Sequence, residues 1–126
     1  MSNIYTNFKA KLSTNALTTI YTVPAEKAAI IKSIRVSNED TVNDCNISVS
    51  LVDSNSISYN LETDRTIQAK RSQEILATGN MAQDTSDSSV AAPAPLIAKE
   101  SEKIQAQAQN GNDLSIIISV LEISSR

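Results

Sequence analysis

The side chains in this sequence that could perform chemistry are mainly carboxylates. Asp53, Glu62 and Asp64 are close together in the chain, and a pair of carboxylates is the group that hydrolyses glycosidic bonds. Their spacing does not require them to converge, and such residues are ordinary at strand ends. Asp84 and Asp87, with neighbouring serines and threonine, supply the oxygen ligands that Ca²⁺ prefers, but the spacing and the glycine of an EF-hand loop are missing. We therefore expect a solvated loop there, and neither a catalytic residue nor a metal site.

Histidine is absent from the 126 residues of the chain. It is the commonest general base near neutral pH and a frequent metal ligand. Its absence excludes Ser-His-Asp and Cys-His catalysis and the His-rich metal sites of small enzymatic β-barrels. Cys45 is the only cysteine, so we expect it to be a small buried apolar residue. The sequence therefore predicts a protein that is not an enzyme and holds no cofactor.

Sugar-binding modules usually present aromatic rings on which sugars stack, and this chain is poor in them. Its aromatic residues are Tyr5, Phe8, Tyr21 and Tyr59. Phe8 and Tyr21 fall on apolar faces of expected strands, so we expect them in the core. Asn46 begins a glycosylation acceptor pattern, but it lies inside an expected strand, and we see no secretory signal before it.

The charge balance argues against nucleic acid and membrane partners. The net charge is −3 and the sequence pI is about 4.8. The longest basic run is Lys70-Arg71, far from the clustered cations of a nucleic-acid site. The longest apolar runs, such as 116–118, are much too short to span a membrane as a helix. Lys9, Lys11, Lys70 and Arg71 are most simply solvated positions that protect strand edges from aggregation.

Alternation of apolar and polar residues runs through most of the chain, and this period of two is typical of β-strands. We predict an all-β protein of eight or nine antiparallel strands with little helix, either a β-sandwich or a jelly roll. One domain covers 1–126, with a long excursion loop at about 79–95 and a mobile N-terminal arm at 1–7. The segment 72–78 is either a strand or one helical turn. The other predicted strands are 8–12, 17–23, 28–37, 46–51, 57–61, 66–69, 103–108 and 113–123.

Two local patterns give specific expectations. Within 28–37, we place Ile30, Ile34 and Val36 on one face and Ile31 on the other. Asn110-Gly111 precedes the last strand and supplies the positive φ angles of a tight hairpin.

The last strand is apolar on both faces. One face carries alternating residues from Leu114 to Val120, and Ile117, Leu121 and Ile123 lie on the other. Because each sheet of a two-layer sandwich buries only one face, this strand should be central and the surplus apolar face should meet another subunit. The candidate interface residues are therefore Ile117, Leu121 and Ile123.

The order of these strands resembles that of small virion structural proteins of tailed bacteriophages, especially cyanophage ones. The resemblance lies in strand pattern, in the runs 16–25, 28–38, 67–69, 104–108 and 114–123. It implies a β-sandwich without catalytic residues that assembles as rings, trimers or lattices. It further implies that the protein is made in the host cytoplasm and ends in the virion.

Two functions remain open at this stage. The first is an auxiliary structural protein of a phage particle, in capsid decoration or in the neck, tail or baseplate, that associates with copies of itself and with other virion proteins. The second is a host-recognition or glycan-binding module of a phage fibre.

Overall fold

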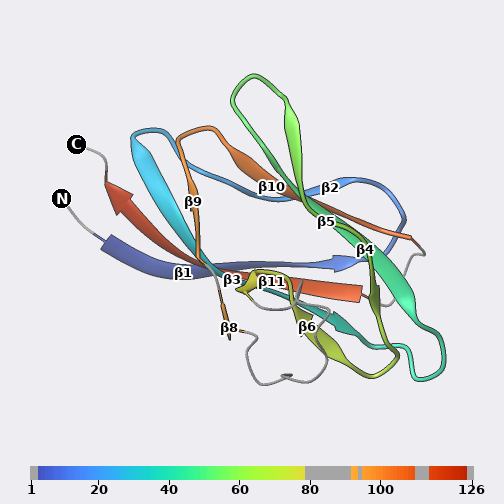
Figure 1. The fold of residues 1–126 in the computed structure, drawn as a ribbon. Helices are drawn as coiled ribbons and strands as arrows, with labels where there is room; N and C mark the ends of the chain where they lie inside the picture. Colours follow the sequence, from blue (N-terminus) through green and yellow to red (C-terminus); the bar gives the residue numbers. More distant parts are fainter. Residues whose placement is uncertain (1–2, 79–91, 94, 110–113, 125–126) are drawn as a thin grey trace.

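The structure is a computed structural model that describes residues 3–78, 92–93, 95–109 and 114–124. Two antiparallel sheets pack face to face, and the described residues include no helix. The predicted all-β sandwich is therefore confirmed (Figure 1). Two expected features lie outside the described residues. They are most of the excursion loop, at 79–91 and 94, and the Asn110-Gly111 turn.

The first sheet has five strands. One edge of β3 pairs with β11, and the opposite edge pairs with both β6 and β9. These strands are β1 (Asn3–Leu12), β11 (Leu114–Ser124), β3 (Lys27–Asn38), β6 (Ser72–Glu74) and β9 (Leu96–Ala98). The second sheet consists of β2 (Thr18–Thr22), β10 (Lys103–Ala108), β4 (Cys45–Val52) and β5 (Ser58–Ile67). A separate short pair joins β7 (Ala77–Thr78) to β8 (Ala92–Pro93).

The strand order identifies a jelly roll. The first sheet has the order β1-β11-β3-β6 and the second the order β2-β10-β4-β5. The chain therefore crosses between the sheets after β1, β2, β3, β5, β9 and β10, and its first and last main strands lie side by side. Eight antiparallel strands in these two orders form the double Greek key of a jelly roll. This decides the alternative that the strand pattern left open.

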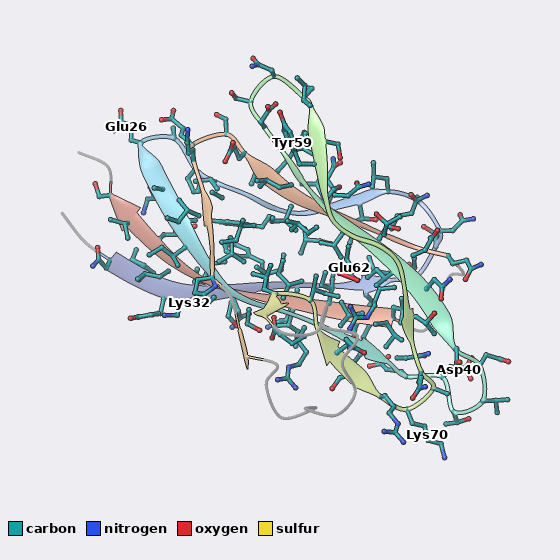
Figure 2. The ribbon with its side chains drawn as sticks, viewed as in Figure 1. Glu26, Lys32, Asp40, Tyr59, Glu62 and Lys70 are labelled. Atoms are coloured by element: carbon teal, nitrogen blue, oxygen red, sulfur yellow. The ribbon has the colours of Figure 1, made fainter. Side chains whose placement is uncertain are left out.

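The core between the sheets is almost entirely aliphatic, as the composition requires (Figure 2). β11 is central, and its inward residues are fully buried: Leu114, Ile116, Ile118 and Val120. The prediction for this face of the last strand is confirmed. Phe8 stacks on buried Tyr21 with ring centroids 4.4 Å apart, and Cys45 is buried, which confirms the expectations for all three residues.

A β-bulge in β3 overturns the predicted phase of that strand. Ile31 pairs with Val120 and Ser33 pairs with Ser119, so Lys32 is an extra residue without a partner in the ladder. The extra residue reverses the alternation, and Ile31 faces the core while Ile30 faces outward. Our placement of Ile30 on the inner face was wrong because a bulge leaves no mark in the hydrophobic pattern.

Several boundaries also differ from the predictions. Residues 57–61 and 66–69 were expected as two strands, but β5 is continuous from Ser58 to Ile67. The segment 72–78 contains strands β6 and β7 and no helical turn. The expected N-terminal arm is largely part of β1, because Asn3 already pairs with Ile123. Backbone pairing with β11 supplies the order that the polar side chains of this segment do not predict.

Four turns and a bulge within β5, at Asp64, use a non-glycine residue in the left-handed region. The residues and their φ angles are Glu26 (63°), Ser56 (67°), Asp64 (50°), Lys70 (66°) and Ser101 (71°). This conformation costs about 1–2 kcal/mol for a residue with a Cβ atom. The chain has only two glycines, so it makes tight turns at a local cost in stability.

Candidate subunit interface

The outer face of the first sheet carries the side chains of β1, β11, β3 and β9 that point away from the core. Every second residue of a strand points to the same side of its sheet, so the register between strands defines rows of neighbours across this surface. We call this surface the outer face. The two main sheets form the two layers of the sandwich, and the outer face is the surface of the first sheet that does not meet the second (Figure 1).

One row of the outer face is entirely apolar. Tyr5 pairs with Leu121, Leu121 with Ile30, and Ile30 with Ile97. These four residues, the apolar row, therefore form a line across four strands. Tyr5 is 75% exposed and Ile97 67% exposed, while Ile30 and Leu121 are half-buried. Contiguous exposed apolar side chains of this kind mark contact surfaces more often than scattered ones do.

The three predicted interface residues all point to the outer face, but the structure places them differently. Leu121 lies within the apolar row. Ile123 lies beside the row, between Asn3 and Ala28, and is half-buried. Ile117 is 42% exposed and lies apart from the row, between Lys9 and Arg35.

The residues that complete the row were missed by the sequence interpretation. Ile30 was assigned to the core, Tyr5 to a mobile arm, and Ile97 to no strand. If the alternation of Phe8–Leu12 is continued back along the chain, Tyr5 falls on the same face as Lys9. Nothing local in the sequence marks the three-residue strand β9, which exists because it pairs with Ala29–Ile31.

The outer face is also cationic. Lys9, Lys11, Lys32 and Arg35 lie on it, and Lys11 forms an ion pair with Glu39 at 2.8 Å. Among the described residues, no carboxylate lies within ion-pair distance of the other three cations. Besides Glu39, the described carboxylate on this face is Glu74 of β6, opposite Arg35 in the register. The face therefore combines an apolar row with unbalanced positive charge.

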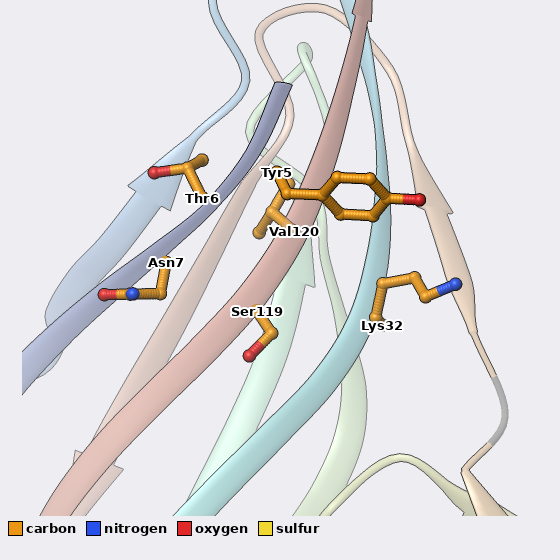
Figure 3. Close-up of a pocket in the computed structure, with 6 residues that line it drawn as sticks. All are labelled: Tyr5, Thr6, Asn7, Lys32, Ser119 and Val120. Atoms are coloured by element: carbon orange, nitrogen blue, oxygen red, sulfur yellow. The ribbon is translucent and has the colours of Figure 1, made fainter. Parts of the chain in front are cut away.

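A shallow groove lies at the β-bulge, between the apolar row and the cations. It is lined by Tyr5, Asn7, Lys32 and Ser119, with Thr6 and Val120 at its margin. Figure 3 shows the Tyr5 ring lying over β11 and directed towards β3, on which Lys32 stands. An aromatic ring, an ammonium group, an amide and a hydroxyl thus surround one surface depression.

Glu74 holds the bulge that presents Lys32. Its Oε1 accepts a hydrogen bond from the hydroxyl of Ser33 at 2.5 Å, and its Oε2 accepts one from the backbone N–H of Ile34 at 2.8 Å. The same Oε2 also accepts from the N–H of Leu76 at 3.2 Å. The carboxylate therefore fills the edge of β3 between its pairing with β6 and its pairing with β9, directly beside the bulge. β-Bulges commonly re-aim one side chain, and here that side chain is Lys32.

The outward face of the second sheet has a different character. Thr19 pairs with Gln105, Gln105 with Ser50, and Ser50 with Asn60, so its central row is neutral and polar. The side chain of Gln105 donates a hydrogen bond to the hydroxyl of Thr19 at 3.0 Å. Thr19 and Asn60 of this row are exposed, whereas Ser50 is buried. The two outer surfaces of the jelly roll thus differ, and only the first sheet presents an apolar row.

The carboxylates that could have formed a catalytic pair have structural roles. Asp53 accepts hydrogen bonds from the N–H groups of Asn55 and Ile57 in the β4–β5 turn. Glu62 forms an ion pair with Arg65 at 2.8 Å. Glu62 pairs with Val49, four residues from Asp53 along β4, which corresponds to about 13 Å. Asp53 and Glu62 are therefore not neighbours across the sheet. Asp64 lies at the bulge in β5, where its N–H donates to Oγ of Ser48 at 3.0 Å.

The metal hypothesis is not supported by the described residues, which contain no cluster of three or more potential ligands. Asp84 and Asp87 lie outside the described residues. No helix in the described part of the chain is long and apolar enough to cross a membrane.

No protein-family model matches this chain, and no curated protein matches it. Solved structures of similar shape exist. One is a chain of the acidic stable capsid of Helicobacter pylori bacteriophage KHP30, with a TM-score of 0.47 and 16% identity over 100% of this chain and 90% of that one. Another is the Drosophila NLP core, described for pentamer formation and histone binding, with a TM-score of 0.48 and 14% identity over 94% and 97%.

A third is the VP2 protein of infectious bursal disease virus in T=1 particles, with a TM-score of 0.47 and 8% identity. The match covers 98% of this chain but only 32% of that protein. Phage and viral capsid proteins are thus among the structural neighbours. At TM-scores below 0.5 these likenesses do not extend to a common function, which must be argued from the surface of this chain.

Proposed function

We propose that this chain is a non-enzymatic structural subunit of a bacteriophage particle that acts by associating with other subunits through its outer face. It serves in capsid decoration or in the neck, tail or baseplate. The observation that carries the proposal is the apolar row on the outer face of the first sheet. The strand pattern resembles that of virion proteins of tailed phages, and this resemblance supports a phage particle as the assembly to which the chain belongs.

The apolar row contributes favourably to association with a partner that covers it. Complete burial of one large apolar side chain contributes about 1.5–3 kcal/mol. Tyr5 and Ile97 are mostly exposed, and Leu121 and Ile30 are half-buried. A partner that covers the row therefore gains part of this burial free energy from each of the four side chains. The strands that carry the row belong to a rigid sheet, so little conformational entropy opposes its burial.

The chemistry of the described residues agrees with a structural role. The carboxylates brace turns and a bulge, and the buried groups form a packed aliphatic core. The expected partners are copies of this chain and other virion proteins, and the expected location is the virion.

Quantitative mass spectrometry of purified particles tests this proposal, combined with labelled-antibody imaging. Many copies over the head indicate decoration, and a few copies at one vertex or on the tail indicate a neck, tail or baseplate component. Leu121→Asp, which places a charge in the apolar row, should reduce incorporation at least tenfold. Thr22→Asp is the matched control, because Thr22 is exposed on the second sheet. Absence of the wild-type chain from particles would refute the proposal.

The second candidate function is binding of a host glycan. The groove with exposed Tyr5 and Lys32 favours it, because an aromatic ring beside a cation suits an acidic saccharide. A glycan array with acidic and neutral saccharides tests it. Binding that is lost in Tyr5→Ala but retained in Tyr59→Ala, a tyrosine exposed on the β4–β5 hairpin, would support this candidate over the first (Figure 2). Absence of binding across the array counts against it.

A further inference from the structure

The charges of this chain are separated between the outer face and the rest of the molecule. Among the described residues, four cations and two carboxylates, Glu74 and the Glu39 that pairs with Lys11, lie at the outer face, which gives it a net charge of +2. The other six described cations and nine described carboxylates carry a net charge of −3. Two outer faces placed against each other would repel, whereas an outer face placed against another part of a second copy would be attracted.

One loop offers both an apolar side chain and negative charge. Residues 39–44, which we call the acidic loop, join β3 to β4 and contain Glu39, Asp40 and Asp44. Val42 in this loop is 78% exposed, the largest exposed fraction among the large hydrophobic side chains of the described residues. Glu39 is already paired with Lys11 of the same chain, so Asp40 and Asp44 are the carboxylates that the loop offers beside Val42. An exposed valine beside two carboxylates is complementary to an apolar row flanked by lysines and an arginine.

The acidic loop is held rigidly by its own hydrogen bonds. Asp40 Oδ1 accepts from the N–H groups of Val42 at 2.8 Å and Asn43 at 3.0 Å. Buried Asn38 donates from Nδ2 to the carbonyl of Asn43 at 3.0 Å and accepts from the N–H of Asp40 at 2.9 Å. The carbonyl of Asp40 also accepts from the N–H of Lys70 at 3.0 Å. A loop already ordered in this way loses little entropy when it docks.

The loop and the apolar row lie at opposite ends of β3. Ile30 is near the start of this strand and Asn38 is its last residue, so they are separated by about 26 Å. Figure 2 shows Asp40 and Lys70 together at the end of the sandwich opposite Glu26, which precedes β3. The loop of one molecule therefore cannot reach its own apolar row, but it can reach that of a neighbour.

We propose that copies of this chain associate head to tail, with the acidic loop of one copy docked on the outer face of the next. Val42 packs on the apolar row, and the carboxylates of the loop lie near Lys32 and the other cations. Such a contact joins two different surfaces, so it generates a ring if the rotation closes and a lattice or filament if it does not. This inference rests on the proposed function and names its partner as a second copy.

Two variants test the contact by complementation in sedimentation velocity experiments. Leu121→Asp disables the outer face, and Val42→Arg disables the loop by removing the apolar group and adding a like charge. Each variant alone should be monomeric where the wild type associates. Their equimolar mixture should form a 1:1 heterodimer, because the intact loop of one variant docks on the intact face of the other. Raising the salt concentration should weaken association of the wild type about tenfold, since charge pairs contribute.

Ile57→Arg is the matched control for the loop variant, because Ile57 is 51% exposed on the β4–β5 hairpin and should not affect association. Circular dichroism spectra establish that every variant is folded. Association of Val42→Arg at wild-type strength, or a mixture that stays monomeric, would overturn the head-to-tail contact. A wild-type chain that is monomeric but present in particles would also overturn it and leave the proposed function standing. Absence from particles would instead count against the proposed function.

Discussion

The hydroxyl of Tyr21 donates a hydrogen bond of 2.7 Å to Oε2 of Glu122, and this contact joins the two sheets across the core. Tyr21 belongs to β2 and Glu122 to β11, 101 residues later. Glu122 is only 8% exposed, and its other oxygen lies 3.9 Å from Nζ of Lys27. A carboxylate in an aliphatic sandwich would be costly without such partners, because burial of an unpaired charge is strongly unfavourable.

Substitution Tyr21→Phe should destabilise the fold. It leaves the ring on Phe8 but removes the donor to Glu122, so the buried carboxylate loses a hydrogen bond worth about 1.5–3 kcal/mol. Urea unfolding followed by circular dichroism measures the change. Tyr59→Phe is the control, because Tyr59 is exposed on β5 and should change the free energy of unfolding by less than about 0.5 kcal/mol. Equal stability of the two variants would show that the contact does not contribute.

The same contact should make stability depend on alkaline pH. Burial raises the pKa of Tyr21 above its ordinary value of 10.0, and the hydrogen bond to Glu122 and its negative charge raise it further. The folded state therefore holds the phenolic proton more tightly than the unfolded state. The contribution of Tyr21 is fully present below pH 10 and falls by up to about 1.4 kcal/mol per pH unit above it.

Comparison with Tyr21→Phe isolates this effect, because all other ionisable groups are common to both proteins. The difference in unfolding free energy between wild type and variant should be constant from pH 7 to pH 9 and should shrink between pH 10 and pH 11. A constant difference up to pH 11 would contradict the predicted shift.

Glu74→Gln should loosen the β-bulge that presents Lys32. Glutamine keeps one acceptor oxygen for the N–H of Ile34 but replaces the other by a donor NH2 group, so Ser33 must accept where it had donated and both bonds lose the negative charge of the carboxylate. We expect a loss of about 1–3 kcal/mol in unfolding free energy and faster hydrogen exchange at the Ile34 amide. Glu100→Gln is the control, because Glu100 is exposed in the β9–β10 turn. Unchanged exchange at Ile34 would mean that the bulge does not depend on Glu74.

The β4–β5 turn provides a matched pair of serines. Ser56 has a φ angle of 67°, whereas Ser54 is not among the residues with positive φ. Ser56→Gly removes the cost of the left-handed conformation, about 1–2 kcal/mol, and part of this gain is offset by the greater freedom of glycine in the unfolded chain. We expect a net stabilisation of about 0.5 kcal/mol in urea unfolding. Ser54→Gly should instead destabilise the protein by a similar amount, and a gain in both variants would contradict this explanation.

The register of the first sheet shows where sequence reasoning stopped. The two-sided apolar pattern of the last strand correctly predicted a central strand with Ile117, Leu121 and Ile123 on the outer face. The apolar row that contains Leu121 was not foreseen, because its other members come from strands far apart in the chain. Ile30 was assigned to the core, since the bulge at Lys32 changes the phase of β3 without changing its hydrophobic pattern.

The sequence alone determined the class of this protein. Alternation with a period of two specified the strands, and the aliphatic composition specified the kind of core. Only the tertiary structure decided the jelly-roll order, the bulge held by Glu74, and the alignment of Tyr5, Leu121, Ile30 and Ile97. The physical reason is that local pattern depends on neighbours in the chain, whereas strand order and register depend on pairing between segments distant in sequence.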